Sequence, residues 1–216
     1  MNFKANEVIH VEPGETLLGY KDIRPVPEKY IKELNDLFYR LDNQPGTLIL
    51  KLKQLYALLN RFNNEFVSTF TACKKGCSAC CKIDVRLTHF EAEYIAMATS
   101  IPHVTSTSSQ GHKSACPFLS EKGTCSIYNY RPLFCRTYHV LSDPILCNDP
   151  DAQVLQYGVQ KAGMGNFIYK SASEWIYFHT YHAFGHIEFR DIRDFFPYDR
   201  SDIQSFLKTN NPKPPC

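Results

Sequence analysis

The chain has 216 residues, of which 24 are Lys or Arg and 22 are Asp or Glu, and its charges form no block of one sign. This length allows a real hydrophobic core, so the chain does not need metal merely to fold, and the charge pattern argues against a nucleic-acid partner. No stretch reaches the roughly 18 apolar residues of a membrane helix, and the first residues lack the apolar run of a signal peptide. We therefore expect a cytoplasmic protein with no nucleic-acid and no membrane partner.

The first third of the chain predicts a helical hairpin. Residues 1–27 contain three prolines and are expected to form an irregular lead-in. Apolar residues then recur at helical spacing over 28–41 and again over 47–70, on either side of a Pro-Gly break. Two such stripes separated by a short break favour an antiparallel pair of helices within residues 28–72.

Later helices are shorter in the sequence pattern. Thr88 and Glu91 match a capping box ahead of a helix that ends near Ser100, and the Ser/Thr-rich residues 101–114 predict a surface loop. Pro132 favours a helical turn after it, and a small hairpin is expected near Cys125. Further helices are predicted over 149–163, over 173–183 with Ser173 as the cap and Gly185 as the stop, and over 201–208 before a Pro-rich tail.

These elements predict a mainly α protein: a single helical domain with a loop-rich, cysteine-ligated metal site. Within it, residues 73–140 are the expected metal-binding region. Residues 141–216 are expected to be a helical C-terminal part of the same domain.

Cysteines carry the clearest functional signal. Seven of the nine lie between residues 73 and 135, and four of these lie within residues 73–81. In a reducing cytosol, clustered cysteines bind metal or do redox chemistry more often than they form disulfides. Thiolates are soft ligands that bind zinc, copper(I) and iron–sulfur clusters. The predicted metal ligands are Cys73, Cys77, Cys80, Cys81, Cys116, Cys125 and Cys135.

The spacing of the first cysteines suggests how they are shared. Cys73, Cys77 and Cys80 can turn around one centre, and Gly76 allows the sharp backbone turn. Cys80 and Cys81 are adjacent, so we expect their side chains to diverge. Seven sulfurs exceed the four that one tetrahedral ion or one four-iron cluster uses, which leaves one centre with a subset of ligands or two centres.

The spacing of Cys73, Cys77 and Cys80 also matches radical S-adenosylmethionine enzymes. That chemistry usually sits on a β/α barrel, and the sequence shows no alternation of strands and helices that would predict one.

The combined motifs resemble a known family. Cys73-x3-Cys77-x2-Cys80-Cys81, a following Leu-Thr-x-x-Glu, Cys116-Pro-Phe-Leu, and Cys125-Ser-Ile-Tyr-x-x-Arg-Pro-x-x-Cys135-Arg-x-Tyr are similar to the zinc- or iron-chelating cysteine-cluster family. The resemblance covers about Cys73 to Tyr138 and implies that all seven cysteines chelate metal. The metal implied is iron, as in a 4Fe–4S cluster, or zinc, with iron slightly favoured. Cys147 is a candidate for an eighth position.

The same resemblance implies an alternative function. A flagellin lysine N-methylase that uses S-adenosylmethionine is similar in its cysteine motifs. This chain would then be an S-adenosylmethionine-dependent enzyme that modifies a protein substrate. No segment of the sequence can be identified as a binding site for this cofactor, and no catalytic residue can be identified.

Histidines give a weaker signal. His179, His182 and His186 are spaced to share one helical face, which would allow a second metal site with nearby carboxylates. Gly185 is expected to end the helix first, so we favour ordinary, partly buried histidines. His139 lies beside the cluster and is a candidate nitrogen ligand.

Arg131 and Arg136 flank Cys135. Two interpretations of these arginines are open: they offset the negative charge of a thiolate-rich site, or they pair with a carboxylate or cap a helix end.

Overall fold

The computed structural model describes residues 25–74, 76–104, 114–149, 152, 154–158, 163–164 and 166–210. These residues form seven α-helices, four short 3-10 helices and five short strands, which confirms the prediction of a mainly α protein. By their contacts, the residues fall into two compact units. Unit 1 consists of Met1–Lys75 and Arg136–Trp175, and unit 2 of Gly76–Cys135 and Ile176–Cys216.

The α-helices are α1 (Glu28–Asn43), α2 (Leu48–Glu65), α3 (His89–Thr99), α4 (Leu133–Thr137), α5 (Phe167–Phe184), α6 (Ile192–Phe195) and α7 (Arg200–Asn210). The 3-10 helices are η1 (Val67–Thr69), η2 (Ala79–Lys82), η3 (Tyr128–Tyr130) and η4 (Pro144–Asn148). The strands are β1 (Arg86–Thr88), β2 (His139–Val140), β3 (Gln156–Tyr157), β4 (Gly163–Met164) and β5 (Phe189–Asp191). Across the described ranges, none of these helices has both the length and the apolar character required to cross a bilayer.

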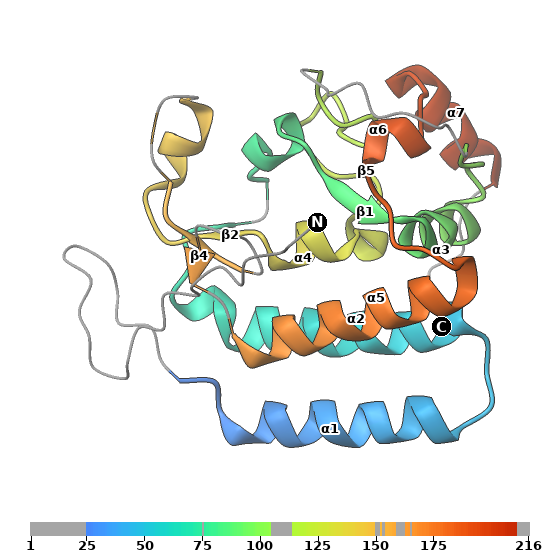
Figure 1. Ribbon diagram of the computed structural model, residues 1–216. Coiled ribbons are helices and arrows are strands. Elements are labelled where there is room, and N and C mark those ends of the chain that lie inside the picture. Colours follow the sequence, from blue (N-terminus) through green and yellow to red (C-terminus); the bar gives the residue numbers. More distant parts are fainter. Residues whose placement is uncertain are drawn as a thin grey trace. The chain divides into compact units, whose positions relative to one another are not determined.

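Unit 1 contains the predicted hairpin, with α1 and α2 side by side (Figure 1). The Thr47 side chain accepts a hydrogen bond from the N–H of Leu50 and so forms the N-cap of α2, a position that threonine favours. The α-helix ends at Glu65, earlier than the sequence pattern predicted, and the chain continues as η1. The apolar stripe nevertheless runs on, because the rings of Phe66 and Phe70 pack edge to face across this change in helix type.

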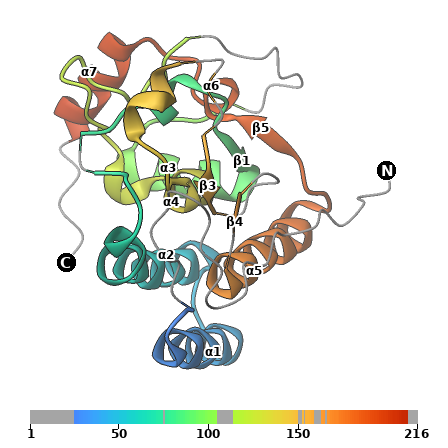
Figure 2. The ribbon, with the colours of Figure 1, turned by 90° about the vertical axis from the view of Figure 1, so that its left-hand side faces the viewer.

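The first half of α5 lies along α2 within unit 1 (Figures 1 and 2). The rings of Phe62 and Tyr169 meet edge to face at 5.6 Å, and the Tyr169 hydroxyl donates to the side chain of Asn63. The prediction that Ser173 caps this helix is wrong. The helix begins at Phe167, where the Asn166 side chain accepts the N–H of Tyr169, and the Ser173 hydroxyl bonds inside the helix.

Unit 1 also holds a small sheet in the order β2-β3-β4. Strand β3 pairs antiparallel with β2 and parallel with β4. The prediction of a helix over 149–163 is therefore wrong for the described residues in this range. A tertiary contact explains why this segment is extended and not helical. The extended backbone places the ring of Tyr157 in the core, with its centroid 5.0 Å from that of Phe70. The next residue, Gly158, lies so close to Thr137 that a Cβ would sit 2.0 Å from its carbonyl oxygen.

Unit 2 is built on the antiparallel ribbon of β1 and β5, which pairs Leu87 with Arg190 (Figure 2). Helix α3 begins directly after β1, and its capping box between Thr88 and Glu91 is present as predicted. Helix α7 covers the predicted last helix and contacts α3. The hairpin expected near Cys125 appears as a single antiparallel bridge to Leu119. Most of the predicted 101–114 loop lies outside the described residues.

The buried phenol of Tyr157 predicts a loss of stability at high pH. Burial raises its pKa from 10.0 to about 12, so the protonated phenol stabilises the fold fully below pH 10. This stabilisation is lost as the pH rises toward the folded-state pKa. Between pH 9 and 11 the wild type should lose about 1 kcal/mol more of its unfolding free energy than Tyr157→Phe. Urea unfolding of both proteins at the two pH values measures this, and equal losses would contradict it.

Candidate metal centre

Eight of the nine cysteines lie in the described residues, and none of these eight forms a disulfide there. The structure divides the predicted ligands between the two units. Cys73 belongs to unit 1, where its sulfur accepts the N–H of Val140 at 3.2 Å. Unit 2 holds the other six: Cys77, Cys80, Cys81, Cys116, Cys125 and Cys135.

Four cysteines from distant parts of the sequence come together within unit 2. Cys81 lies in η2, and its carbonyl accepts the N–H of Cys116 at 2.7 Å. Cys125 lies in the turn that the bridge to Leu119 closes, and Cys135 lies in α4. The charge on any of these thiolates acts on its neighbours: Cys135 interacts electrostatically with the other three. Cys135 is thus an electrostatic neighbour of the other three thiols, and the four are here called the thiol cluster: Cys81, Cys116, Cys125 and Cys135.

Burial determines the protonation of two members of the thiol cluster. Burial raises the pKa of Cys116 to about 12 and raises the pKa of Cys135 well above its usual value. Negative charge on neighbouring thiolates acts in the same direction as burial in both cases. Without a cation, these two thiols stay protonated at neutral pH.

Cys81 behaves differently from Cys116 and Cys135. A hydrogen bond with Cys80 and the charges of Arg131 and Arg193 together lower the pKa of Cys81 to about 7, although burial acts in the opposite direction. The prediction that the side chains of Cys80 and Cys81 diverge is wrong, because the tight turn of η2 keeps the two thiols in contact. Cys80 and Cys81 are thus available together at the same edge of the cluster.

The donor set fits a metal ion or cluster that prefers sulfur. Several thiols that repel one another as anions gain most from a bound cation, which replaces their protons and cancels the repulsion. Zinc and iron–sulfur centres both take four thiolates in this way. The thiol cluster supplies that number from two loops, the 3-10 helix η2 and the helix α4.

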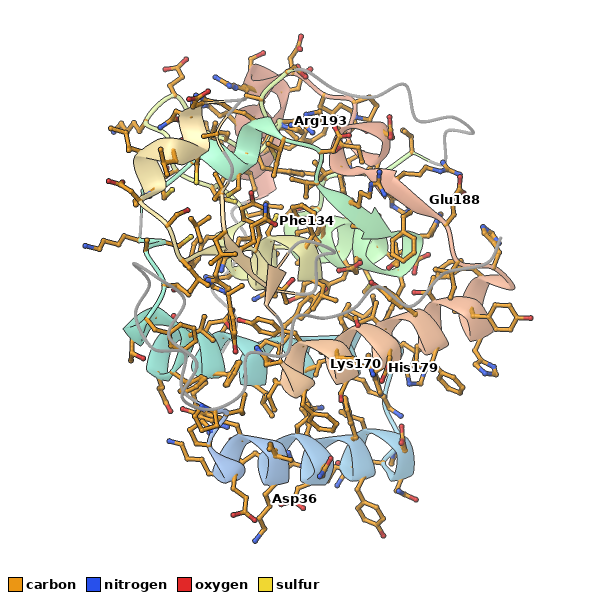
Figure 3. All side chains as sticks on the ribbon, turned by 60° about the vertical axis from the view of Figure 1, so that its left-hand side comes forward. Asp36, Phe134, Lys170, His179, Glu188 and Arg193 are labelled. Atoms are coloured by element: carbon orange, nitrogen blue, oxygen red, sulfur yellow. The ribbon has the colours of Figure 1, made fainter. Side chains whose placement is uncertain are left out.

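A buried ion pair fixes the backbone that carries Cys81. Arg193 and Asp191 are only 5% and 4% exposed in their side chains, and their closest charged atoms lie 2.8 Å apart. The guanidinium also donates to the carbonyls of Cys81 and Ile83, while the Asp191 carboxylate accepts the N–H of Val85. Arg193 is labelled in Figure 3, among the side chains of unit 2. The pair thus holds the chain on the C-terminal side of η2.

A second buried carboxylate, Glu91, positions Cys135. One of its oxygens accepts the N–H and hydroxyl of Thr88, which completes the capping box. Its other oxygen accepts the N–H of Leu133 at 2.7 Å, at the first residue of α4. Glu91 therefore joins the start of α3 to the start of the helix that carries Cys135. Two of the sequence motifs, Leu-Thr-x-x-Glu and Arg-Pro-x-x-Cys, are linked by this contact.

The two arginines beside Cys135 have different roles. The Arg131 charge lowers the pKa of both Cys81 and Cys135, which supports the interpretation that it offsets thiolate charge. Its guanidinium also lies 3.7 Å from the ring centroid of Tyr128. Arg136 is fully buried in unit 1, where it lies over the ring of Tyr56 and donates to Asn60.

Two further candidate metal ligands, His139 and Cys147, lie in unit 1. The Nε2 atom of His139 is 2.9 Å from the carbonyl of Arg136, and its ring stacks on Tyr169, so this nitrogen is engaged with the backbone. Cys147 lies in η4 and is half-buried. Cys216 lies outside the described residues.

The three histidines near the end of α5 do not share a helical face. The helix ends at Phe184 because Gly185 has a φ of +76°, so His186 lies beyond it. His186 instead faces Glu188 at 4.0 Å, and His182 is exposed beside Phe178. Of the three, only His179 is partly buried as predicted, whereas His182 and His186 are exposed.

A different group of metal-ligating side chains in unit 2 was not predicted from the sequence. His89, Glu93 and His103 each place one possible ligand atom within 4.8 Å of the other two. Burial lowers the pKa of His89, and the neighbouring His103 lowers it further. The spacing of His89 and Glu93, four residues apart on a helix, was a signal that could have been noticed. His103 could not have been joined to them, because it lies beyond the end of α3.

The clustered cysteines are consistent with a metal-binding role. Residues 72–158 match a family model, CxxCxxCC, described as "Putative zinc- or iron-chelating domain". The match covers less than half of the chain, contains all seven predicted ligands and Cys147, and confirms the family resemblance. A search of curated proteins and a search of solved structures each found no match.

The buried contacts of Glu91 predict a measurable loss when its charge is removed. In Glu91→Gln one amide N–H group must face a backbone N–H donor, either at Thr88 or at Leu133. We expect a loss of about 1–3 kcal/mol in unfolding free energy, the cost of an unsatisfied buried polar group, together with weaker metal binding by the cysteines. Urea unfolding and metal analysis measure the two effects.

Glu121→Gln is the matched control, because it makes the same change at an exposed carboxylate of the same unit. It should leave stability nearly unchanged. If both variants lose the same amount, Glu91 has no special positioning role.

Proposed function

We propose that this chain binds iron as a 4Fe–4S cluster, with the thiol cluster of unit 2 as the ligand set. The observation that carries the proposal is that Cys81, Cys116 and Cys125, each from a separate segment, all act electrostatically on Cys135, while the backbones of Cys81 and Cys116 are hydrogen-bonded. Each corner of such a cluster takes one cysteine, so four thiols from different segments meet its requirement.

Charge supports a thiolate-bound centre at this place. Thiolates around a metal leave an excess of negative charge, which nearby cations stabilise. Arg131 and Arg193 both act electrostatically on Cys81, and Arg193 is held there by its pair with Asp191. An arginine keeps its charge at any relevant pH, so this stabilisation does not depend on protonation.

The preference for iron over zinc comes from the family resemblance, because thiolate chemistry accepts both metals. Cys73, Cys77 and Cys80 remain predicted ligands in addition to the thiol cluster. With seven thiols available, they would serve a second centre or exchange with members of the first. The contact between Cys80 and Cys81 favours exchange at that edge of the cluster.

In this proposal the metal joins segments of unit 2 that are far apart in the sequence: η2, the turn at Cys125 and the start of α4. Bound metal would then contribute directly to the stability of this unit. Its removal should leave Cys116 and Cys135 as protonated, buried thiols.

Purification without oxygen, followed by metal, sulfide and absorption measurements, tests the proposal. We expect about four irons and four acid-labile sulfides per chain, with a broad absorption band near about 400 nm. A colourless protein with one or two zinc ions would overturn the iron assignment and make the site a zinc centre.

Substitutions test the ligand set separately from the identity of the metal. Cys125→Ser and Cys135→Ser should each lose most of the bound metal. Ser78→Ala, a change in the same cysteine-rich loop that removes no thiol, should retain it. Full retention of metal in Cys135→Ser would contradict the assignment of the thiol cluster.

The methylase alternative remains a prediction of the resemblance. Calorimetric titration of the metal-loaded chain with S-adenosylmethionine tests it directly. Absence of heat at high micromolar concentrations of this ligand would exclude this function and its protein substrate.

A further inference from the structure

We propose that His89, Glu93 and His103 form a second metal site in unit 2, for a zinc ion or a similar first-row divalent ion bound through nitrogen and oxygen. The site is separate from the cysteines in both its residues and its ligand chemistry. It goes beyond the proposed function and does not depend on it.

The two imidazoles already have nearly the spacing that a shared ion requires. Their Nε2 atoms lie 3.4 Å apart, and the rings meet at 83°. Two nitrogens bound to one tetrahedral zinc at 2.0–2.1 Å would be separated by about 3.4 Å. The ion would replace the proton that the two nitrogens now share, because a metal-bound imidazole is neutral.

Glu93 provides the third ligand with a small movement. Its Oε1 lies 4.0 Å from the His89 Nε2 atom, so it must approach by about 0.7 Å to reach tetrahedral spacing. The two residues lie one helical turn apart on α3, and the Glu93 side chain is 40% exposed. Rotation about its own side-chain bonds can therefore supply this movement while the backbone stays in place.

The position of His103 is fixed from outside α3. The next residue, Val104, donates its N–H to the Phe195 carbonyl at 2.9 Å. The rings of Phe195 and Phe196 lie beside the imidazole of His103. His89 in turn packs against Phe184 at 4.6 Å. These apolar walls restrict the orientations of both imidazoles and hold their nitrogens together.

The charges around the group are compatible with a divalent cation. Arg190 and His186 act electrostatically on His89 and would repel an ion. Glu188, which is labelled in Figure 3, pairs with Arg190 and lies 4.0 Å from His186. The negative charge of Glu188 therefore offsets the positive charge of both residues. Glu93 adds a negative charge directly at the site.

Two histidines and one glutamate leave one coordination position for water. Three protein ligands with an open fourth position are typical of catalytic zinc sites, whereas structural sites are closed by four. The partial exposure of Glu93 and His89, at 40% and 23%, gives an ion and a small ligand access to this position. Nitrogen and oxygen donors also select against the metals that favour thiolates.

Cobalt(II) titration of the full chain, with its cysteine centre already loaded, tests the proposal. We expect one further equivalent of cobalt with weak visible bands and no thiolate charge-transfer absorption. His103→Ala should weaken this binding by about 100-fold or more and Glu93→Gln by about tenfold or more. The cysteine-centre absorption should stay the same, so failure of this site is distinguishable from failure of the other.

His182→Ala is the matched control, because it removes an exposed histidine of the same unit. It should bind the extra cobalt like the wild type. His103→Gln, which keeps a polar side chain of similar size, provides a second variant if His103→Ala does not fold. The proposal is overturned if the wild type binds no extra cobalt, or if the folded His103 variant binds it with unchanged affinity.

Discussion

The buried pair of Asp191 and Arg193 is the contact on which the thiol cluster depends most. Removing two charges from water is costly, and such a pair is stable only when further hydrogen bonds satisfy the remaining groups. Here those further bonds go to the backbone on the C-terminal side of η2, at Cys81, Ile83 and Val85. These contacts offset part of the cost of burial, although the buried Nε atom of Arg193 has no hydrogen-bond partner among the described residues. They also fix a cysteine-bearing segment that has no long helix or strand of its own.

Glu91 does the same for the other side of the cluster. Its two oxygens satisfy the beginning of α3 and the beginning of α4, and the side chain is only 2% exposed. A capping box usually serves its own helix, but this one also anchors a second helix that carries Cys135. Both halves of the thiol cluster are therefore placed by buried charged side chains that bond to backbone, which explains why its loops can be short and irregular.

Unit 2 brings together two kinds of donor that suit different metals. The thiol cluster offers sulfur beside two arginines, whereas the group of His89, Glu93 and His103 offers nitrogen and oxygen between aromatic rings. The metal that each site selects depends on the type of its donor atoms and on their geometry more than on raw affinity. Under the two proposals above, one compact unit would hold a thiolate centre and a second centre that keeps a position for a solvent molecule.

The sequence alone determined the helical hairpin, the capping box at Thr88 and the stop at Gly185, because each depends on periodicity or on the backbone preference of nearby residues. It also identified the cysteines and the family they resemble. Long-range packing decided the rest: Tyr157 enters the core as part of a strand, and Cys80 meets Cys81 in a tight turn. His103 joins His89 only because the chain after α3 is tied to the backbone at Phe195. Such contacts link residues distant in the sequence, so no local pattern encodes them.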